Sequence, residues 1–206
     1  DITDLLRREP TRIDENRIGT SLSGRRIMVT GAGGSIGREL CRQIARWMPA
    51  SLILLGHGEN SIFETLLDVQ QNFPSLPIHP VIADIRDRDR LNVVFDQLRP
   101  EVVFHTAAHK HVPLMEVNVE EVVTNNIIGT RNVVETSLKY NVERLVLIST
   151  DKAIRPSSVY GASKRLSEML VLDAARRTNL AYSVVRFGNV LGSRGSVIPK
   201  FHRQIA

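Results

Sequence analysis

A glycine-rich turn at residues 29–37 constrains this chain more than any other feature. Its sequence is VTGAGGSIG, and it follows a short apolar run and precedes a helix-like stretch. A strand, a tight glycine turn and a helix in succession place backbone N–H groups where they can hold a pyrophosphate. Gly31, Gly34 and Gly37 are three residues apart, which differs from the G-x-G-x-x-G form, so the spacing alone also allows a plain turn.

The rest of the chain alternates between strand and helix patterns. Short apolar runs rich in Val and Ile suit strands that are buried on both faces of a parallel sheet. The predicted strands are residues 26–31, 51–55, 78–84, 101–107, 144–150 and 181–187. The predicted helices are residues 35–47, 60–72, 87–99, 119–140 and 160–178. Six strands alternating with five helices predict an α/β fold with a doubly wound parallel sheet, which binds ligands at the carboxyl ends of its strands.

The first 24 residues do not fit this alternation. Residues 1–8 suit a short helix that Pro10 ends, and residues 12–22 suit an extended arm. We therefore expect residues 1–24 to be an N-terminal arm or linker from an upstream segment, and residues 25–206 to be the dinucleotide-binding core.

Composition excludes several classes of protein. The 206 residues are 42% hydrophobic and 24% charged, as in ordinary globular domains, and no apolar run approaches the length that spans a bilayer. The single cysteine, Cys41, excludes an intrachain disulfide and fits a reducing compartment, and we expect a buried thiol in a cytoplasmic protein. The net charge of +5 comes from basic residues scattered among acids, with only 5% aromatics, so we expect no nucleic-acid binding.

Candidate cofactor contacts follow the second, third and fourth predicted strands. Glu59 lies near the place where a dinucleotide site puts an acid on the ribose hydroxyls, and it equally suits a helix cap. No arginine stands ready for a 2′-phosphate, which favours NAD over NADP. Asp84 and Ile85 would lie at the adenine, although Asp84 also suits a cap. Ala107 and Ala108 would let a cofactor lie close to the backbone.

The segment after the fourth predicted strand also carries three histidines and a lysine. No partnering carboxylate or cysteine pattern accompanies His105, His109 and His111, so we expect no metal site. Lys110 is a cation in a strand-end loop, which suits either a phosphorylated ligand or a solvated surface.

The residues best suited to chemistry follow the fifth predicted strand. Tyr160 and Lys164 are four apart and share one face of a helix. A nearby ammonium favours the phenolate, which predicts a lowered pKa of Tyr160 and a role as general base. Thr150 precedes Asp151 and Lys152, an acid and an amine that lie either beside this base or in a surface ion pair.

With these motifs the sequence resembles the extended short-chain dehydrogenase/reductases. Within them it is similar to the UDP-N-acetylglucosamine 4,6-dehydratases of the CapD-like polysaccharide-biosynthesis group. The resemblance runs through nearly all of residues 24–206. The stretches that carry it are residues 30–37, 107–116, 149–153, Tyr160 with Lys164, and 186–197.

This resemblance implies a Rossmann fold that binds NAD(P) and a lyase that acts on a UDP-sugar through a transient 4-keto intermediate, in surface polysaccharide or glycan biosynthesis. Tyr160, assisted by Lys164 and Thr150, would take the proton of the sugar C4 hydroxyl. Lys152 would remove the C5 proton, and Asp151 would protonate the departing C6 hydroxyl.

The motifs and the resemblance together predict the binding residues. Those expected at the cofactor are Gly31, Gly34, Ser35, Ile36, Gly37, Glu59, Asp84, Ile85, Ala107, Ala108, Tyr160, Lys164 and Val190. Those expected at the substrate are Lys110, Asn126, Asn189, Arg194, Gly195, Ser196 and Val197. Asn126 is alternatively an ordinary polar helix residue.

Two departures from the family pattern shape the remaining expectations. Extended members continue into a substrate-covering domain, and long members carry a membrane anchor before a stretch similar to residues 4–10. We expect a truncated core that lacks most of the C-terminal substrate domain, binds cofactor, forms a homo-oligomer and is inactive alone. Its parent would be anchored at the inner face of the cell membrane. A nucleotide-sugar 4-epimerase and a non-catalytic NAD(P)-binding module stay open as alternatives.

Overall fold

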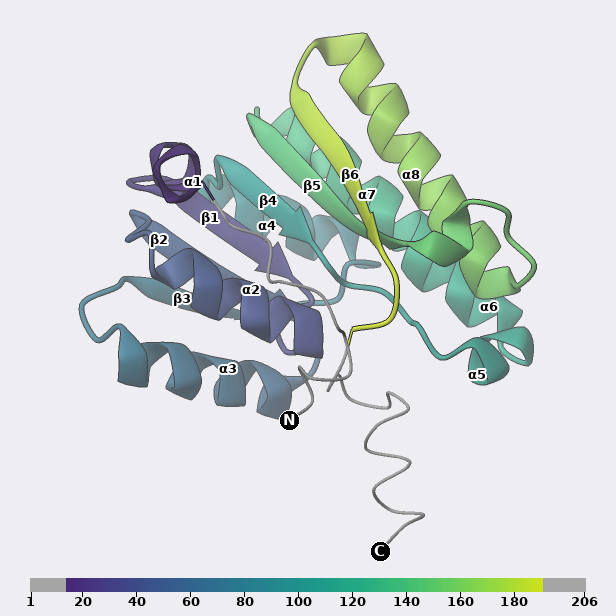
Figure 1. The fold of residues 1–206 in the computed structure, drawn as a ribbon, viewed down its shortest axis with the longest axis horizontal. Coiled ribbons are helices and arrows are strands. Elements are labelled where there is room, and N and C mark those ends of the chain that lie inside the picture. The colour runs from purple at the N-terminus through teal and green to yellow at the C-terminus, as the bar shows by residue number, and fades with distance from the viewer. Residues whose placement is uncertain (1–13, 191–206) are drawn as a thin grey trace, which may run out of the picture.

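A computed structural model describes residues 14–190 of the chain. Six parallel strands form one sheet in the order β3-β2-β1-β4-β5-β6, and helices cover both of its faces (Figure 1). This is the doubly wound α/β fold that the alternating pattern predicts, so that prediction is confirmed. Four predicted binding residues lie outside the described residues: Arg194, Gly195, Ser196 and Val197.

Every predicted strand is present, and the ends of each lie within about two residues of the prediction, which is usual for element boundaries. The strands are β1 (Arg26–Thr30), β2 (Ser51–Gly56), β3 (Ile78–Ile82), β4 (Val102–His105), β5 (Arg144–Thr150) and β6 (Ala181–Phe187). The helices are α1 (Glu15–Leu22), α2 (Ser35–Ala45), α3 (Glu59–Asn72), α4 (Arg88–Leu98), α5 (Val112–Glu116), α6 (Val119–Val122), the π-helix η2 (Val123–Ile128), α7 (Gly129–Lys139), the 3₁₀ turn η3 (Asp151–Ala153) and α8 (Val159–Thr178).

The central strands pack into a separate apolar layer on each face of the sheet. Ile27 and Val29 of β1 lie in the layer beneath α2 and α3, whereas Met28 lies in the layer beneath α4, α7 and α8. All three side chains are completely buried. Because successive residues point to opposite faces and both faces are covered, such strands are apolar at every position. Cys41 lies on the buried face of α2, and burial raises the pKa of its thiol well above the ordinary range.

The prediction of an extended arm at residues 12–22 is wrong for its described part. Helix α1 occupies Glu15–Leu22, and Ile18 and Leu22 in it show the four-residue spacing of a helix face. A Cβ at Gly19 would lie 3.2 Å from the Trp47 ring, and Leu22 packs against the layer beneath α2 and α3. These distant contacts stabilise a helix that is too short to be stable alone.

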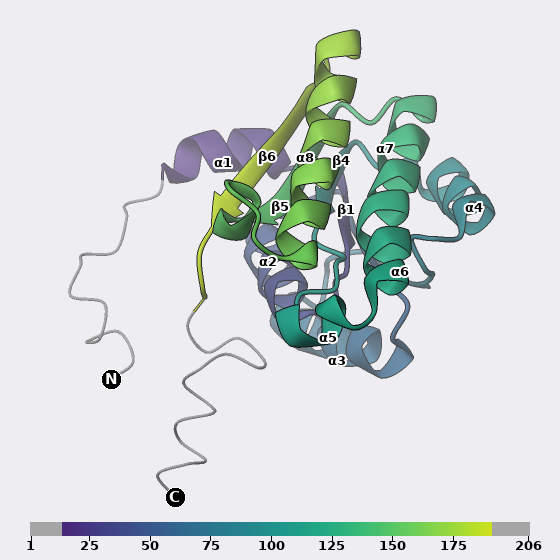
Figure 2. The same ribbon diagram turned by 90° about the vertical axis from the view of Figure 1, so that its right-hand side faces the viewer.

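The helix predicted at residues 119–140 is confirmed as one continuous helical stretch over residues 119–139, although a π-helical segment within it changes the hydrogen-bond pattern. The π-helix η2 separates α6 from α7 and buries the side chains of Asn125 and Asn126. Short helix α5, which the sequence pattern did not predict, precedes them. Figure 2 shows α5 and α6 beside the N-terminal end of α8, with α7 and α8 side by side. A π-turn inside a helix often marks a functional site.

None of the helices between residues 14 and 190 has both the length and the apolar character that a bilayer span requires.

Candidate active site

A cavity of about 170 Å³ lies where the strand order reverses, at the carboxyl ends of β1 and β4. A doubly wound sheet binds a dinucleotide at this reversal. Five of the predicted cofactor-binding residues line the cavity: Gly31, Gly34, Ile85, Ala107 and Ala108. The other lining residues are Leu55, Gly56, His57, Ala83, Thr106, His109 and Asn125.

Two glycines shape the end of this cavity that lies beside the N-terminus of α2. Gly31 has a φ of +71°, which only glycine adopts without strain, and a Cβ there would lie 2.6 Å from the Ala107 nitrogen. A Cβ at Gly37 would lie 2.2 Å from the Gly31 oxygen, so α2 approaches the turn only because Gly37 has no side chain. Gly34, the N-cap of α2, puts no side-chain acceptor over the first turn of the helix. An anion therefore fits at this helix N-terminus, as a pyrophosphate requires.

Two predicted cofactor contacts lie away from this cavity. Glu59 begins α3 after the N-cap Gly58 and lines a second hollow on the β3 side, together with Phe63 and Ile82. Asp84 accepts a hydrogen bond from Arg86 Nη2 at 2.7 Å. His57, directly after β2, lines the cavity together with Leu55 and Gly56 at the end of that strand. The proposed contacts of Glu59 and Asp84 with a cofactor remain predictions.

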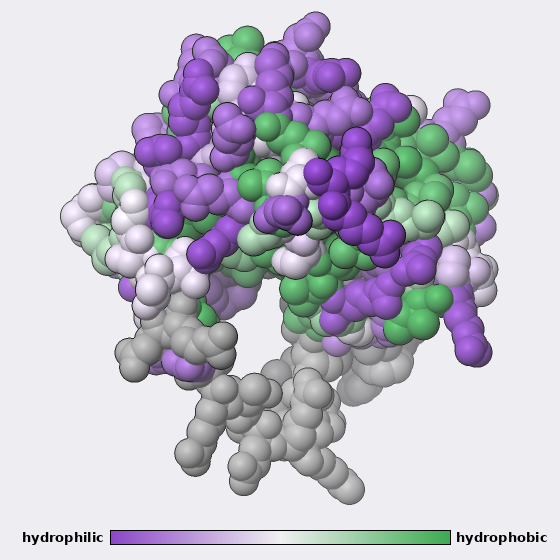
Figure 3. Space-filling view, turned by 90° about the horizontal axis from the view of Figure 1, so that it is seen from above, coloured by the Kyte–Doolittle hydropathy of each residue, from purple (hydrophilic) through white to green (hydrophobic). Residues whose placement is uncertain are grey.

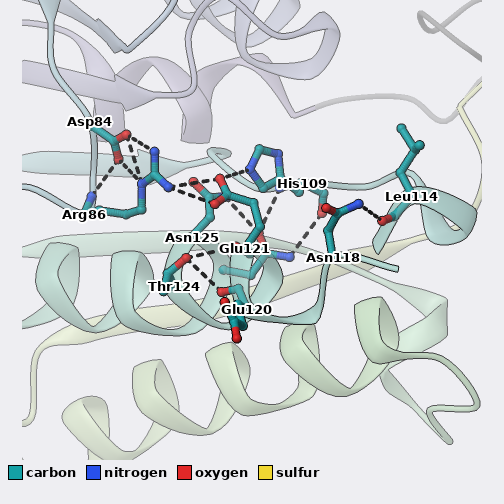
Figure 4. Close-up of polar contacts among 10 residues, drawn as sticks. Asp84, Arg86, His109, Leu114, Asn118, Glu120, Glu121, Thr124 and Asn125 are labelled. Atoms are coloured by element: carbon teal, nitrogen blue, oxygen red, sulfur yellow. Dashed lines mark hydrogen bonds and ion pairs between the residues drawn. The ribbon is translucent and has the colours of Figure 1, made fainter. Parts of the chain in front are cut away.

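Ion pairs and a hydrogen bond join the ends of β3 and β4 to helix α6 (Figure 4). Arg86 pairs with Asp84 on one side and with Glu121 on the other, at 2.9 Å from Nη1 to Oε1. Glu121 in turn contacts His109 Nε2 at 3.1 Å. The hydrogen-bonded Arg86 guanidinium holds the pKa of Asp84 below its ordinary value. These contacts fix His109, and therefore one wall of the cavity.

His105 belongs to a buried hydrogen-bond chain. Its Nδ1 lies 2.6 Å from Thr30 Oγ1, and its Nε2 lies 3.0 Å from Thr130 Oγ1. Because the Thr130 hydroxyl donates to the Asn126 carbonyl, it accepts from Nε2–H, and Thr30 donates to Nδ1. Burial lowers the pKa of His105 to about 3, so the ring is neutral. Within residues 14–190, no cluster of His, Cys, Asp and Glu has an arrangement suited to a metal ion.

The Asn126 side chain is buried and has all of its hydrogen-bonding positions occupied. Its Oδ1 accepts from the backbone N–H of His109 and from Asn125 Nδ2. Its Nδ2 donates to the His109 carbonyl and to Ser163 Oγ, each at 3.1 Å. We interpret Asn126 as the residue that holds the loop after β4 against α8, and its contact with a substrate remains a prediction. Lys110 lies in the same loop with an exposed side chain.

The structure brings the predicted catalytic residues together at the end of β5. Thr150 Oγ1 donates to Asp151 Oδ1 at 2.9 Å, and Lys152 Nζ lies 3.1 Å from the same oxygen. Tyr160 forms a hydrogen bond with Thr150. Lys152 Nζ also donates to Asn189 Oδ1 at 3.4 Å, which adds a predicted substrate contact from the end of β6. Their catalytic roles remain predictions, although their proximity is now observed.

A close backbone contact produces this proximity. Ser158 begins α8 by accepting a hydrogen bond from the Gly161 N–H at 3.0 Å. A Cβ at Gly161 would lie 2.5 Å from the Lys152 oxygen. The first turn of α8, with Tyr160 in it, therefore packs directly on the η3 turn because residue 161 is glycine.

Burial controls the titration of the paired Tyr160 and Lys164. Lys164 is buried and donates to the Ile148 carbonyl at 2.8 Å, and burial lowers its pKa to about 8. Burial also raises the pKa of Tyr160 above its ordinary value, and this effect outweighs the hydrogen bond with Thr150. The predicted lowering of the Tyr160 pKa is therefore wrong for this structure. The hydrogen-bonded Lys152 ammonium holds the pKa of Asp151 below its ordinary value.

Comparison with known proteins shows close relatives. A family model described as polysaccharide biosynthesis protein matches residues 27–206. The chain is 50% identical over 203 residues to the probable polysaccharide biosynthesis protein EpsC of Bacillus subtilis, covering 98% of this chain and 34% of that protein. It is 36% identical to a UDP-N-acetylglucosamine 4,6-dehydratase (inverting) of Campylobacter jejuni, covering 89% of this chain and 54% of the relative.

Solved structures show the same fold. The UDP-glucose 4-epimerase of Thermus thermophilus, solved in complex with NAD, matches with a TM-score of 0.71 and 27% identity. The match covers 82% of this chain and 57% of that one. The chain therefore spans between a third and somewhat more than half of the length of these three proteins.

Proposed function

Because this chain belongs to the polysaccharide biosynthesis protein family, we propose that it is the core of a nucleotide-sugar 4,6-dehydratase that uses NAD(P) and acts on UDP-N-acetylglucosamine or a similar UDP-sugar. One contact supports this proposal above all: the Asp151 carboxylate and the Lys152 amine, 3.1 Å apart, lie on the turn against which Tyr160 packs. A 4-epimerase needs Tyr160 but has no use for a second acid and base.

The cavity between β1 and β4 suits NAD(P). Gly31, Gly34 and Gly37 would hold the pyrophosphate at the start of α2, and Ala107 and Ala108 would let the cofactor lie against the β4 end. The UDP-glucose 4-epimerase of Thermus thermophilus, which has the same fold, was solved in complex with NAD. When bound, the cofactor would accept a hydride from the sugar C4 and return it at C6. NAD rather than NADP stays the prediction.

Tyr160 would remove the proton from the sugar C4 hydroxyl. Its phenol must lose a proton first, and burial opposes this by raising its pKa. Lys164 supplies the compensating charge, because its pKa of about 8 leaves the ammonium largely intact at neutral pH. Thr150, hydrogen-bonded to Tyr160, would pass the proton or hold the C4 oxygen in place.

Asp151 and Lys152 would carry out the elimination that follows. The 4-ketone acidifies the C5 proton, which Lys152 takes as a neutral amine, while Asp151 as a neutral acid protonates the departing C6 oxygen. Proton transfer from Lys152 to Asp151 converts the ion pair into these two forms without a change in net charge. A bound sugar would exclude water from the pair and so favour the neutral forms. Elimination restores the ion pair. When hydride returns to C6, the Lys152 ammonium or solvent would supply the proton that C5 then needs, and Tyr160 would release the C4 proton to solvent, so the protons balance.

The decisive experiment is mass spectrometry of products formed from UDP-N-acetylglucosamine in deuterated water. We expect a 4-keto-6-deoxy product that is lighter by one water and carries solvent deuterium at C5. A product of unchanged mass with inverted C4 would instead show a 4-epimerase. Cofactor binding without either product would show a non-catalytic module.

The same experiment compares product formation by residues 1–206 with product formation by the full-length protein. We expect residues 1–206 alone to bind NAD(P) but to form little or no product, because they span only 54% of the length of the related 4,6-dehydratase. Formation of the 4-keto sugar by residues 1–206 at the rate of the full-length protein would contradict that prediction.

Assembly into a homo-oligomer remains part of the proposal. Helix α8 exposes three large apolar side chains: Leu166, Met169 and Leu172. Figure 3 shows hydrophobic side chains gathered toward one side of an otherwise largely hydrophilic face. Sedimentation of the full-length protein would test whether more than one copy associates.

Gly161→Ala should lower kcat by about 100-fold, because a displacement of about 1 Å at a catalytic group can cost this much. The added methyl group would meet the Lys152 carbonyl oxygen, so the first turn of α8 must move and carry Tyr160 away from Asp151 and Lys152. Steady-state kinetics of the full-length protein measures the effect. Ala162→Gly is the matched control, since this exposed neighbour weakens the helix without changing that contact. An unchanged kcat in Gly161→Ala would refute the packing argument.

A further inference from the structure

Glu168 is a completely buried carboxylate that the proposed chemistry does not use. It lies on α8, four residues after Lys164 and eight after Tyr160, so all three residues share one helix face. Its Oε1 accepts from Ser149 Oγ at 2.6 Å and from Arg186 Nε at 2.7 Å. Its Oε2 accepts from the Arg186 Nη2 and, at 3.2 Å, from Arg165 Nη1.

These partners come from the elements that carry the proposed catalytic residues. Ser149 is the residue before Thr150 at the end of β5. Arg186 lies on β6, three residues before Asn189, which receives a hydrogen bond from Lys152. Glu168 itself belongs to the helix of Tyr160 and Lys164. One carboxylate thus joins β5, β6 and α8 just behind the residues that must be held at fixed separations.

The charges around Lys164 and Glu168 also support a role for Glu168 at this site. The groups that interact with Lys164 are the neutral His105 from β4, the Ile148 carbonyl from β5 and Glu168 from its own helix. Burial lowers the pKa of Lys164, and the Glu168 carboxylate opposes that effect. Burial would raise the pKa of Glu168, but hydrogen bonds from Arg186 and Ser149 outweigh it and keep the carboxylate ionised.

We propose that Glu168 is a positioning residue of this active site, whose carboxylate holds β5, β6 and α8 to one another and keeps the Lys164 ammonium charged beside Tyr160. Its kinetic consequence rests on the function proposed above, and its effect on Lys164 does not.

The test is Glu168→Gln in the full-length protein. The glutamine NH₂ would face the Arg186 guanidinium or the Ser149 hydroxyl, so at least one bond is lost and the negative charge disappears. We expect kcat to fall by about tenfold or more, with KM for the UDP-sugar and Kd for NAD changed by less than about threefold, as for an interaction that matters in the transition state. The pH at which the rate stops rising should become lower, because Lys164 then loses its proton more easily.

A second measurement needs no turnover. The ¹³Cε resonance of Lys164, identified by its absence in Lys164→Met, reports the midpoint of its titration in protein with ¹³C-labelled lysine. We expect a lower midpoint in Glu168→Gln than in the unaltered protein. An unchanged midpoint would overturn the charge part of the proposal, even if the unaltered protein fails to turn over any UDP-sugar and the proposed function falls.

Two variants separate positioning from general stability. Asp173→Asn removes an exposed carboxylate of the same helix, which pairs with Arg177 at 2.9 Å, and should leave kcat and the Lys164 titration unchanged.

Glu168→Gln combined with Arg186→Gln restores a neutral hydrogen-bonded pair. A recovered Tm with a kcat that stays low would support the proposal. The double variant also keeps the test possible if Glu168→Gln alone does not fold. Recovery of kcat together with Tm would overturn it, because Glu168 would then serve only to neutralise Arg186.

Discussion

Tyr160→Phe should lower kcat by about 1,000-fold or more, within the range expected when a general base is removed. The substitution deletes only the phenol oxygen, so the sugar C4 hydroxyl loses the group that would accept its proton. The ring remains to pack in the half-buried position that Tyr160 occupies at the start of α8. Cofactor affinity should change little, because the cavity between β1 and β4 is lined by other residues. Steady-state kinetics with UDP-N-acetylglucosamine, together with a titration of NAD binding, measures both quantities.

The pH dependence of the unaltered protein provides an internal check on this role. Because the pKa of Tyr160 lies above its ordinary value, the rate should rise with pH as more of the phenol ionises. Above a pH of about 8 this rise should level off, because Lys164 loses the charge that favours the phenolate. In Tyr160→Phe the residual rate should lack this rise and plateau. Tyr140→Phe is the matched control, since Tyr140 is the C-cap of α7 and its ring lies 6.3 Å from that of Phe95, away from the site. A Tyr160→Phe protein with normal kcat would show that another group takes the C4 proton.

Lys152→Ala should abolish elimination while leaving the first oxidation intact. The variant lacks the amine that would remove the C5 proton, so dehydration should fall by about 100-fold to 10,000-fold, as for the loss of a general base. Tyr160 and Lys164 are unchanged, and the sugar should therefore be oxidised at C4 and held there. The expected signs are absence of the 4-keto-6-deoxy product and of deuterium at C5, with accumulation of reduced cofactor in its absorbance spectrum.

Lys139→Ala is the matched control for the loss of a lysine. Lys139 ends α7 and donates to Asn92 of α4 at 2.9 Å, on an exposed surface remote from η3. Its substitution should leave product formation unchanged. Normal dehydration in Lys152→Ala would remove Lys152 from the mechanism and, with it, the main argument for a dehydratase over an epimerase.

Much of the architecture was predictable because it depends on local pattern. The apolar runs at residues 51–55 and 144–150 predicted strands that the structure contains with nearly the same ends. Residues 52–55 and 145–148 of these runs are apolar at successive positions because both faces of each strand are covered. The glycine turn was equally informative, since the φ of +71° at Gly31 excludes most other residues.

The residue pairs of the site were predictable only where one element carries both members. Tyr160 and Lys164 share a face of α8, so their spacing alone predicted their proximity. Glu168 follows at the same interval, and this spacing was the available signal that was overlooked. Its partner Arg186 lies on another element and could not be identified in this way, because the pairing depends on β6 lying next to β5.

The amino-acid pattern alone thus specified the alternation of strands and helices, the glycine cradle and the face of α8 that carries Tyr160. Only the tertiary structure decided that Glu59 lies outside the cavity, that Asn126 is fully hydrogen-bonded, and that the pKa of Tyr160 is raised rather than lowered. Backbone conformation and burial periodicity are set by neighbours along the chain. The solvation of a side chain and the charges around it are set by elements that meet only after the sheet has assembled, so they cannot be deduced from residue types and spacing.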